Sequence, residues 1–222
     1  MPTAILIDGA FFLARYTAVL PGVGQHSAAQ VAKNLFTWAL THLEDKDHGK
    51  RDLYRIFYYD CPPLAKKAHH PLTRNPIDFS KTPTFEFRSE FHNELRKLRK
   101  VALRFGRLAN FGRWEIRPKP LKRLLRREIT VDGLQEHDLY YSVQQKGVDM
   151  RIGLDIASLA FKRQVDQIVL FAGDSDFVPA AKLARREGID FILDPMWKPI
   201  PPDLHEHIDG LRSTCPRPQH GS

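Results

Sequence analysis

Acidic side chains follow several apolar runs of this sequence, at the points where those runs end. Asp8 closes the run 3–7, and Asp174 and Asp176 directly follow the run 167–172, in a stretch without Lys or Arg. Clustered carboxylates repel one another, and the pKa of one of them rises unless a cation lies among them. A hard divalent ion, Mg²⁺ or Mn²⁺, suits a site made of oxygen ligands. Such an ion could activate a water for phosphodiester cleavage.

Each acid taken alone also fits a structural role. Asp8-Gly9 is a common turn dipeptide, and any of the residues 174–176 can cap a helix. Asp60 and Asp194 end two other apolar runs and precede prolines, so we interpret both as ordinary loop starters. The metal hypothesis therefore depends on several acids meeting in space.

The elements that would position these acids alternate between strands and helices. Short apolar runs predict buried strands at 3–7, 53–59, 167–172 and 189–193. Amphipathic spacing predicts helices at 27–43, 151–162 and 175–186. This alternation predicts an α/β domain with a mostly parallel sheet and helices on both faces. Ligands of such sheets bind beyond the carboxyl ends of the strands, where the acids stand.

The segment 61–130 carries most of the positive charge. It holds 18 Lys and Arg against 6 Asp and Glu, whereas the rest holds 16 against 20, giving a net charge of +8. We expect one domain over 1–195, elaborated by this basic segment, and a Pro-rich tail over 196–222. Within the segment, alternation around Asn110-Phe111-Gly112 predicts a hairpin that joins 103–105 to 114–116.

A basic segment of this size attracts polyanions, which indicates a nucleic acid as partner rather than an ordinary solvated face. Phe105, Phe111 and Trp114 could stack on unpaired bases, although packing inside the hairpin is the alternative for Phe105 and Trp114. We expect the nucleic-acid backbone to meet Arg104, Arg107, Arg113, Lys122, Arg123, Arg126 and Arg127. Other cations in the segment that could reach it are Arg96, Lys97, Arg99, Lys100, Arg117 and Lys119.

Other chemistries lack their motifs. The phosphate loop GxxxxGK[ST] and the nucleophile elbow GxSxG are both absent. His205 and His207 stand two residues apart, which does not place them on one helix face for zinc. No apolar run reaches the roughly 18 residues of a membrane span, and no signal peptide is evident. With Cys61 and Cys215 as the only cysteines, we expect a cytoplasmic protein.

Three motifs, in order, resemble the NYN domain, the LabA-like branch of the PIN-like nuclease superfamily. They are Ile5-Leu6-Ile7-Asp8-Gly9, then Lys146-Gly147-Val148-Asp149 followed by Leu154-Asp155, and Gly173-Asp174-Ser175-Asp176-Phe177. The resemblance spans residues 3–194 and implies a Rossmann-like sheet whose acidic pocket binds Mg²⁺ or Mn²⁺ and hydrolyses RNA. Carried over by position, the catalytic and metal-binding acids are Asp8, Asp149, Asp174 and Asp176, with Asp155 as a further acidic position.

The resemblance leaves some roles open. Lys146 contacts phosphate or is a surface lysine, and Ser175 bonds to a metal ligand or caps a helix. Phe11 stands where many members carry an Asn that helps to position the first motif. We therefore expect a metal-dependent endoribonuclease, with a non-catalytic RNA-binding module as the alternative. A small-molecule phosphatase is disfavoured, because the basic segment exceeds what that substrate needs. Homo-oligomerisation stays open.

Overall fold

The computed structural model describes residues 2–20, 26–45, 49–109 and 111–218. Six parallel strands form one sheet in the order β14-β13-β12-β1-β4-β7. They are β1 (Thr3–Asp8), β4 (Leu53–Asp60), β7 (Val101–Phe105), β12 (Gln167–Phe171), β13 (Asp190–Asp194) and β14 (Gly210–Leu211). All five residues of β12 are buried, as expected for an inner strand covered on both faces. The predicted α/β class with a parallel sheet is confirmed, with two more strands than predicted.

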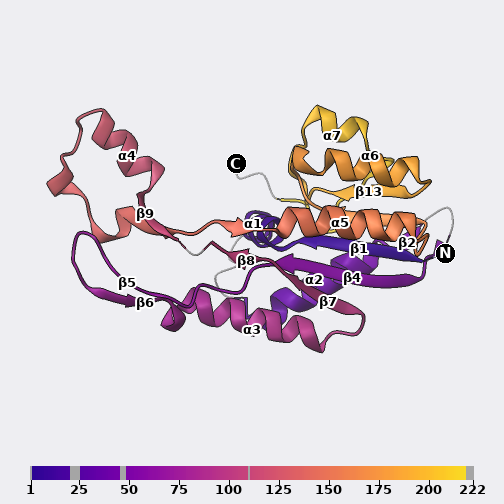
Figure 1. Ribbon diagram of the computed structural model, residues 1–222, viewed down its shortest axis with the longest axis horizontal. Coiled ribbons are helices and arrows are strands. Elements are labelled where there is room, and N and C mark those ends of the chain that lie inside the picture. Colours follow the sequence, from indigo (N-terminus) through magenta and orange to yellow (C-terminus); the bar gives the residue numbers. More distant parts are fainter. Residues whose placement is uncertain (1, 21–25, 46–48, 110, 219–222) are drawn as a thin grey trace.

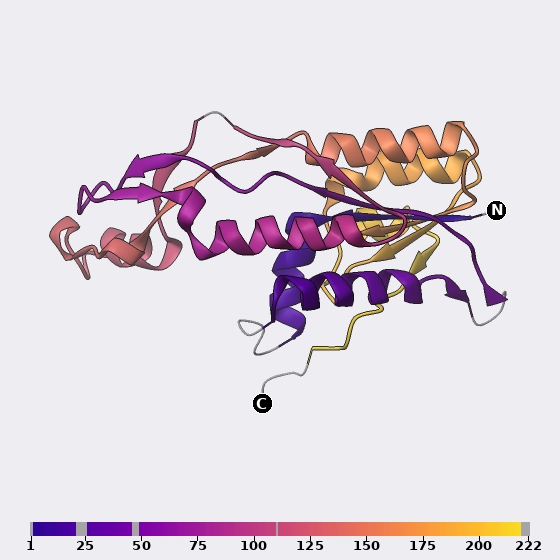
Figure 2. The same ribbon diagram turned by 90° about the horizontal axis from the view of Figure 1, so that it is seen from below.

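Helices cover both faces of the sheet (Figures 1 and 2). Along β1 the side chains alternate, so that Ile5 and Ile7 face one layer of helices while Ala4 and Leu6 face the other. The first layer comprises α1 (Gly9–Val19), α2 (Ala28–Thr41) and α3 (Pro83–Lys97), and the second α5 (Val148–Phe161) and α6 (Val178–Arg186). The result is the Rossmann-like, three-layer arrangement that the alternation of elements predicted.

The order of the strands reverses between β1 and β12. The chain runs outward from β1 through β4 to β7, then returns to β12 beside β1 and continues outward to β13 and β14. Ile7 pairs with Phe171, so the two central strands end at the same level. In open α/β sheets, ligands bind outside the carboxyl ends of the strands at such a reversal. The fold therefore directs attention to the space between Asp8 and the loop after Phe171.

Residues 62–82 and 106–147, which we call the arm, project beyond the carboxyl edge of the sheet (Figure 1). Two antiparallel ladders, β9 with β10 and β8 with β11, join distant parts of the arm. Its elements are β5 (Lys67–His69), β6 (Pro76–Asp78), η2 (Phe79–Lys81), β8 (Arg107–Leu108), β9 (Arg113–Ile116), α4 (Pro118–Leu125), η3 (Val131–Gly133), η4 (Glu136–Asp138), β10 (Leu139–Ser142) and β11 (Gln145–Lys146). The basic segment 61–130 therefore contributes to two parts of the molecule, because it supplies α3 and β7 to the body and most of its other residues to the arm.

The predicted hairpin from 103–105 to 114–116 is wrong. Residues 103–105 belong to β7, which lies parallel to β4 at the edge of the central sheet. Residues 114–116 belong to β9, where Trp114 pairs with Tyr141 of β10. Alternation identified both segments as strands, but it carries no information about which partner each strand selects. Asn110, in the expected turn, lies outside the described residues.

The described part of the chain after residue 195 packs against the rest of the molecule. It adds β14 to the sheet and forms α7 (Pro202–Glu206), and it buries Met196, Leu204 and Cys215. The proposed domain limit at 195 stays a prediction. In the chain segments that the structure describes, no helix has the length and apolar character needed to cross a membrane.

Candidate functional site

Asp8 ends β1 and caps the N-terminus of α1. Its Oδ1 accepts hydrogen bonds from the backbone N–H groups of Ala10 at 3.0 Å and Phe11 at 3.1 Å. Burial raises the pKa of Asp8 to about 6; the bond from Phe11 opposes this rise, and the charge of Asp149 adds to it. The carboxyl group is therefore fixed in position, yet it stays partly protonated near neutrality in the absence of a cation.

Asp149 is coupled to Asp8 by its charge. It lies in the first turn of α5, which begins after Gly147 in a left-handed conformation, with φ 77°. Burial raises the pKa of Asp149, and the charges of Asp176 and Asp174 raise it further. Asp174 accepts a hydrogen bond from the backbone N–H of Asp176 at 3.2 Å. The four predicted acids therefore form a chain of electrostatic neighbours, in which Asp149 links Asp8 to Asp174 and Asp176.

The cluster offers only oxygen donors. No group of three or more His, Cys, Asp or Glu side chains in the described ranges is arranged to hold a metal ion as it stands. Mg²⁺ usually keeps several waters and uses one or two carboxylates together with substrate phosphates. The donor chemistry therefore fits an open, water-rich Mg²⁺ or Mn²⁺ site, in which the substrate would supply the remaining ligands.

Asp155, the fifth predicted acid, already has partners of its own. One of its oxygens, Oδ2, accepts a hydrogen bond from the Tyr59 hydroxyl at 2.8 Å and lies 3.2 Å from Arg104 Nε. The Arg104 guanidinium also lies over the Phe57 ring, 5.2 Å from its centre. These contacts fasten α5 to β4 and β7, which gives Asp155 a positioning role in this structure.

Lys146 and Ser175 are neighbours of the acids in the chain, Lys146 before Asp149 and Ser175 between Asp174 and Asp176. Lys146 is exposed at the end of β11, three residues before Asp149. Ser175 donates a hydrogen bond from its hydroxyl to Asp203 Oδ1 at 3.0 Å, which links the loop after β12 to α7. Ser175 is thus held by a carboxylate, whereas the ammonium group of Lys146 can approach a phosphate.

Phe11, in place of the expected Asn, packs against the backbone of Gly173. A Cβ added to Gly173 would lie 2.9 Å from Phe11 Cε2, and Lys198 Nζ lies 5.8 Å from the centre of the Phe11 ring. A turn with positive φ at Met196 (46°), whose carbonyl accepts two hydrogen bonds from Arg15, leads to Lys198. Sequence reasoning missed Lys198, because it belongs to no motif and reaches the site from the loop after β13.

Asp60 and Asp194 are fully buried, so their interpretation as ordinary loop starters is wrong. His92 Nε2 lies 2.8 Å from Asp60 Oδ2, and the Arg88 guanidinium contacts Oδ1. Burial tends to raise the pKa of Asp60, but His92 and Arg88 together hold it below its usual value. Asp194 has an analogous partner in His42, at 2.8 Å. Asp60 thereby links the end of β4 to α3, and Asp194 links the end of β13 to the C-terminal end of α2.

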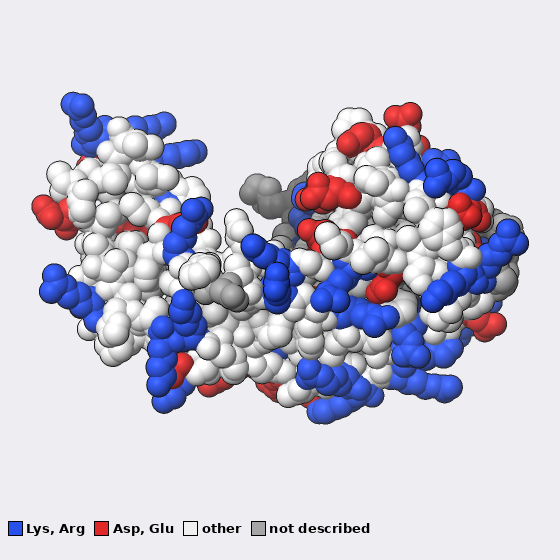
Figure 3. Space-filling view, viewed as in Figure 1, with Lys and Arg blue, Asp and Glu red and all other residues white. Residues whose placement is uncertain are grey.

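The predicted cations occupy separate parts of the molecule. In the view of Figure 3, the surface is hollowed between the arm and the body, and Lys and Arg side chains lie on both sides of the hollow. Arg104 of β7 contacts Asp155, and Arg107 of β8 pairs with Lys146 of β11. Of the other predicted cations, Arg113, Arg117, Lys119, Lys122, Arg123, Arg126 and Arg127 are exposed on the arm. By contrast, residues 97–100 precede β7, so topology places Lys97, Arg99 and Lys100 at the opposite, amino edge of the sheet. The Arg96 guanidinium instead lies over the ring of Phe105, the last residue of β7, 5.6 Å from its centre.

Comparison with known protein families finds a match to the NYN domain over residues 77–200, which is more than half of the chain. The match includes Asp149, Asp174 and Asp176 at the carboxyl edge, whereas Asp8 precedes it. No curated protein and no solved structure matches the chain.

Proposed function

Since this chain belongs to the NYN domain family, within the PIN-like nuclease superfamily, we propose that it is a Mg²⁺- or Mn²⁺-dependent endoribonuclease acting on single-stranded RNA. The observation that carries the proposal is the electrostatic coupling of Asp149 to Asp8 on one side and to Asp174 and Asp176 on the other, where the strand order reverses. The charge of Asp149 raises the pKa of Asp8, and the charges of Asp176 and Asp174 raise that of Asp149. Repulsion of this kind is relieved when a cation binds.

In this proposal Asp8, Asp149, Asp174 and Asp176 hold the ion. A divalent ion at such a site lowers the pKa of a bound water and stabilises charge on the leaving oxygen. The N-terminus of α1 orients Asp8, which releases its proton on binding the cation. Lys146 is exposed beside the acids and supplies positive charge to the RNA backbone, as does Lys198 beside Phe11.

A second candidate function is RNA binding without cleavage. Two observations favour it. Phe11 replaces the Asn expected from the resemblance, and the described carboxylates do not form a ready ligand group of three. In that case the cations of the arm would still bind the RNA backbone. The acids would bind a metal weakly, and the RNA would not be cleaved.

Cleavage of labelled single-stranded RNA distinguishes the two functions. With Mn²⁺ or Mg²⁺ we expect internal cuts that chelator abolishes and that Asp174→Asn reduces by at least about 100-fold. Asp52→Asn is the matched control, because Asp52 is exposed directly before β4, at the amino edge of the sheet. Salt-sensitive binding without any metal-dependent cutting, equal in both variants, would establish the second function instead.

The remaining expectations are also proposals. We propose a cytoplasmic location on the basis of the low cysteine content; both cysteines are free and buried in the structure. Homo-oligomerisation stays open, and sedimentation of the purified chain would test it.

A further inference from the structure

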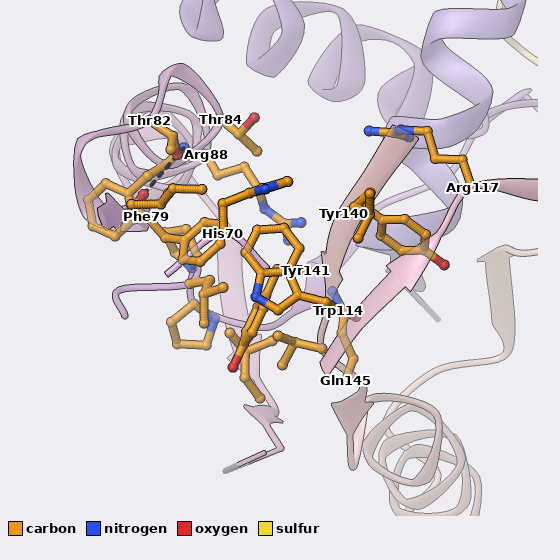
Figure 4. Close-up of a pocket in the computed structure, with 18 of the residues that line it drawn as sticks. His70, Phe79, Thr82, Thr84, Arg88, Trp114, Arg117, Tyr140, Tyr141 and Gln145 are labelled. Carbon is orange, nitrogen blue, oxygen red and sulfur yellow. Dashed lines mark hydrogen bonds between the residues drawn. The ribbon is translucent and has the colours of Figure 1, made fainter. Parts of the chain in front are cut away.

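A cavity of about 560 Å³ lies between the two halves of the arm (Figure 4). One wall comes from the segment around β5, β6 and the first turns of α3, and the other from β9, β10 and Gln145 of β11. This volume falls within the roughly 300–1,000 Å³ that is usual for small-molecule sites. It is separate from the acid cluster, and no predicted catalytic residue lines it.

Aromatic rings from different elements line this cavity: His70, Phe79, Trp114, Tyr140 and Tyr141. Trp114 and Tyr141 face each other across the β9–β10 ladder, with ring centres 5.4 Å apart and an interplanar angle of 74°. The Phe79 ring lies 5.1 Å from Tyr141, and the His70 ring lies 4.8 Å from Trp114. Trp114, Tyr140 and Tyr141 are only partly buried, so part of each ring is open to a planar ligand.

The polar groups of the cavity suit an uncharged heterocycle better than a phosphate. Arg88 lines the wall, but its guanidinium is paired with the buried Asp60, so it offers no free charge to a phosphate. Arg117 and Glu136 also line the cavity, and their opposite charges leave it without a net positive charge. Gln145 is exposed at the wall and can both donate to and accept from a base.

The cavity lies close to the acids along the chain. Gln145 lines it, and Asp149 follows four residues later, so their Cα atoms are separated by at most roughly 14 Å. Lys146 is exposed between them and offers a contact to the backbone of a strand that runs from one to the other. One RNA strand can therefore place a base in the cavity while a nearby phosphate reaches the acids.

From these observations we infer that the arm cavity binds one unpaired nucleobase of the RNA, stacked against Trp114 and Tyr141. The ligand class rests on the proposed function, because RNA is the polymer that the acids would cut. The cavity anchors the strand and so determines which phosphodiester bond lies at the acid cluster.

Binding to two oligomers of equal length and charge tests this inference. In chelator, fluorescence anisotropy would compare oligouridine with its abasic counterpart, which keeps the ribose and phosphate. We expect Trp114→Leu to weaken oligouridine binding by about 5- to 100-fold, the range for one lost base stack, and to leave abasic binding unchanged. Phe161→Leu is the control, since Phe161 is 60% exposed at the end of α5 and does not line the cavity.

A second measurement uses the unmodified chain, in case Trp114→Leu disturbs the folding of the arm. Oligouridine carrying 4-thiouridine would be photo-crosslinked in chelator, and the modified peptides identified by mass spectrometry. We expect adducts on the peptides that contain Trp114 or Tyr141. Equal affinities for the two oligomers, or adducts confined to other segments, would overturn the inference and leave the cavity to a protein ligand. A chain that shows these adducts but never cuts RNA would overturn the ribonuclease proposal alone.

Discussion

The ring of Phe11 fills the space that a side chain on Gly173 would need. A Cβ at Gly173 would lie 2.9 Å from Phe11 Cε2, closer than real Cβ atoms approach other atoms. Phe11 follows Asp8 by three residues, and Gly173 directly precedes Asp174. This contact packs the first turn of α1 against the loop after β12, and so it helps to set the separation of the two strand-end acids.

Gly173→Ala should displace either the loop after β12 or the first turn of α1. We expect cleavage to fall by at least about 10-fold and the free energy of unfolding to fall by about 1–3 kcal/mol from overpacking. Removing the Phe11 ring as well, in the double variant Gly173→Ala/Phe11→Ala, should restore part of the lost cleavage and part of the lost stability. A double-mutant cycle measures both recoveries. Gly153→Ala is the control, because no atom lies within 4 Å of the Cβ it adds. In α5 that change should be neutral or stabilising by up to about 1 kcal/mol. Equal losses of cleavage and stability in Gly173→Ala and Gly153→Ala would contradict the packing argument.

Metal affinity should fall at acidic pH. The pKa of Asp8 is about 6 in the folded chain, so below this value a proton competes with the cation for the carboxylate. We expect the Kd for Mn²⁺ to rise by about 10-fold per pH unit below pH 6, as measured by calorimetry. In Asp8→Asn the affinity should be weaker and this part of the pH dependence should disappear. An affinity that is constant from pH 5 to pH 8 would exclude Asp8 as a ligand.

The same carboxyl group should make the metal-free protein less stable at neutral pH. Its folded-state pKa lies above the unfolded value of about 3.9, so its stabilising contribution is complete below that value and is lost as pH rises through about 6. In chelator at pH 7.5, Asp8→Asn should therefore raise the free energy of unfolding by on the order of 1 kcal/mol, since Asn also caps helices. Denaturant titrations at pH 5, where the gain should be smaller than at pH 7.5, complete the test.

Asp60 should be essential for stability. Removing one partner of a buried ion pair costs about 3–5 kcal/mol, so Asp60→Ala, which leaves Arg88 without its carboxylate, should unfold at much lower urea concentration. Because the pKa of Asp60 is held below its usual value, its contribution is present above the unfolded pKa of about 3.9 and is lost as pH falls further. Glu90→Gln, an exposed change on α3, should stay within about 0.5 kcal/mol of the unmodified chain.

Cations of the arm and of the amino edge should differ in their effect on RNA binding. Lys122, Arg123 and Arg126 line a hollow beside α4, and changing all three to Gln should weaken binding and flatten its salt dependence. Each lost phosphate contact reduces the slope of log K against log salt by about 0.7 for single strands. The matched triple variant changes Lys97, Arg99 and Lys100, which carry the same total charge at the other edge. Equal slopes for the two triples would show that net charge alone attracts the RNA.

The sequence predicted the central sheet well because buried parallel strands have a strong local signal. The runs that became β1, β4, β12 and β13 are apolar almost throughout, and each is closed by a polar residue. The positions of Asp8 and Asp174 at strand ends were predicted from the same apolar runs. By contrast, β7 carries an exposed Arg104 and only partly buried neighbours, so its alternation resembled that of a surface hairpin.

Long-range pairing explains what the sequence could not provide. The burial of Asp60 depends on His92 and Arg88 of α3, about thirty residues away, and that of Asp194 depends on His42, which lies 152 positions earlier in the chain. Neither carboxylate differs locally from an acid at a turn. Lys198 and the arm cavity likewise arise from tertiary contacts, because their neighbours belong to loops and strands that no spacing rule connects.

The position of β1 in the sheet has a consequence for protein synthesis. β1 is made first, but its neighbour β12 is complete only when residue 171 has been translated. At about 5–20 residues per second, Asp8 waits roughly ten to thirty seconds for Asp174 to be added. During that interval the nascent chain has no complete acid cluster, so a ribosome making this protein is not exposed to the cutting activity that we propose. The proposed activity would therefore require the late synthesis of β12 and the loop after it, which bring Asp174 and Asp176 to the centre of the sheet.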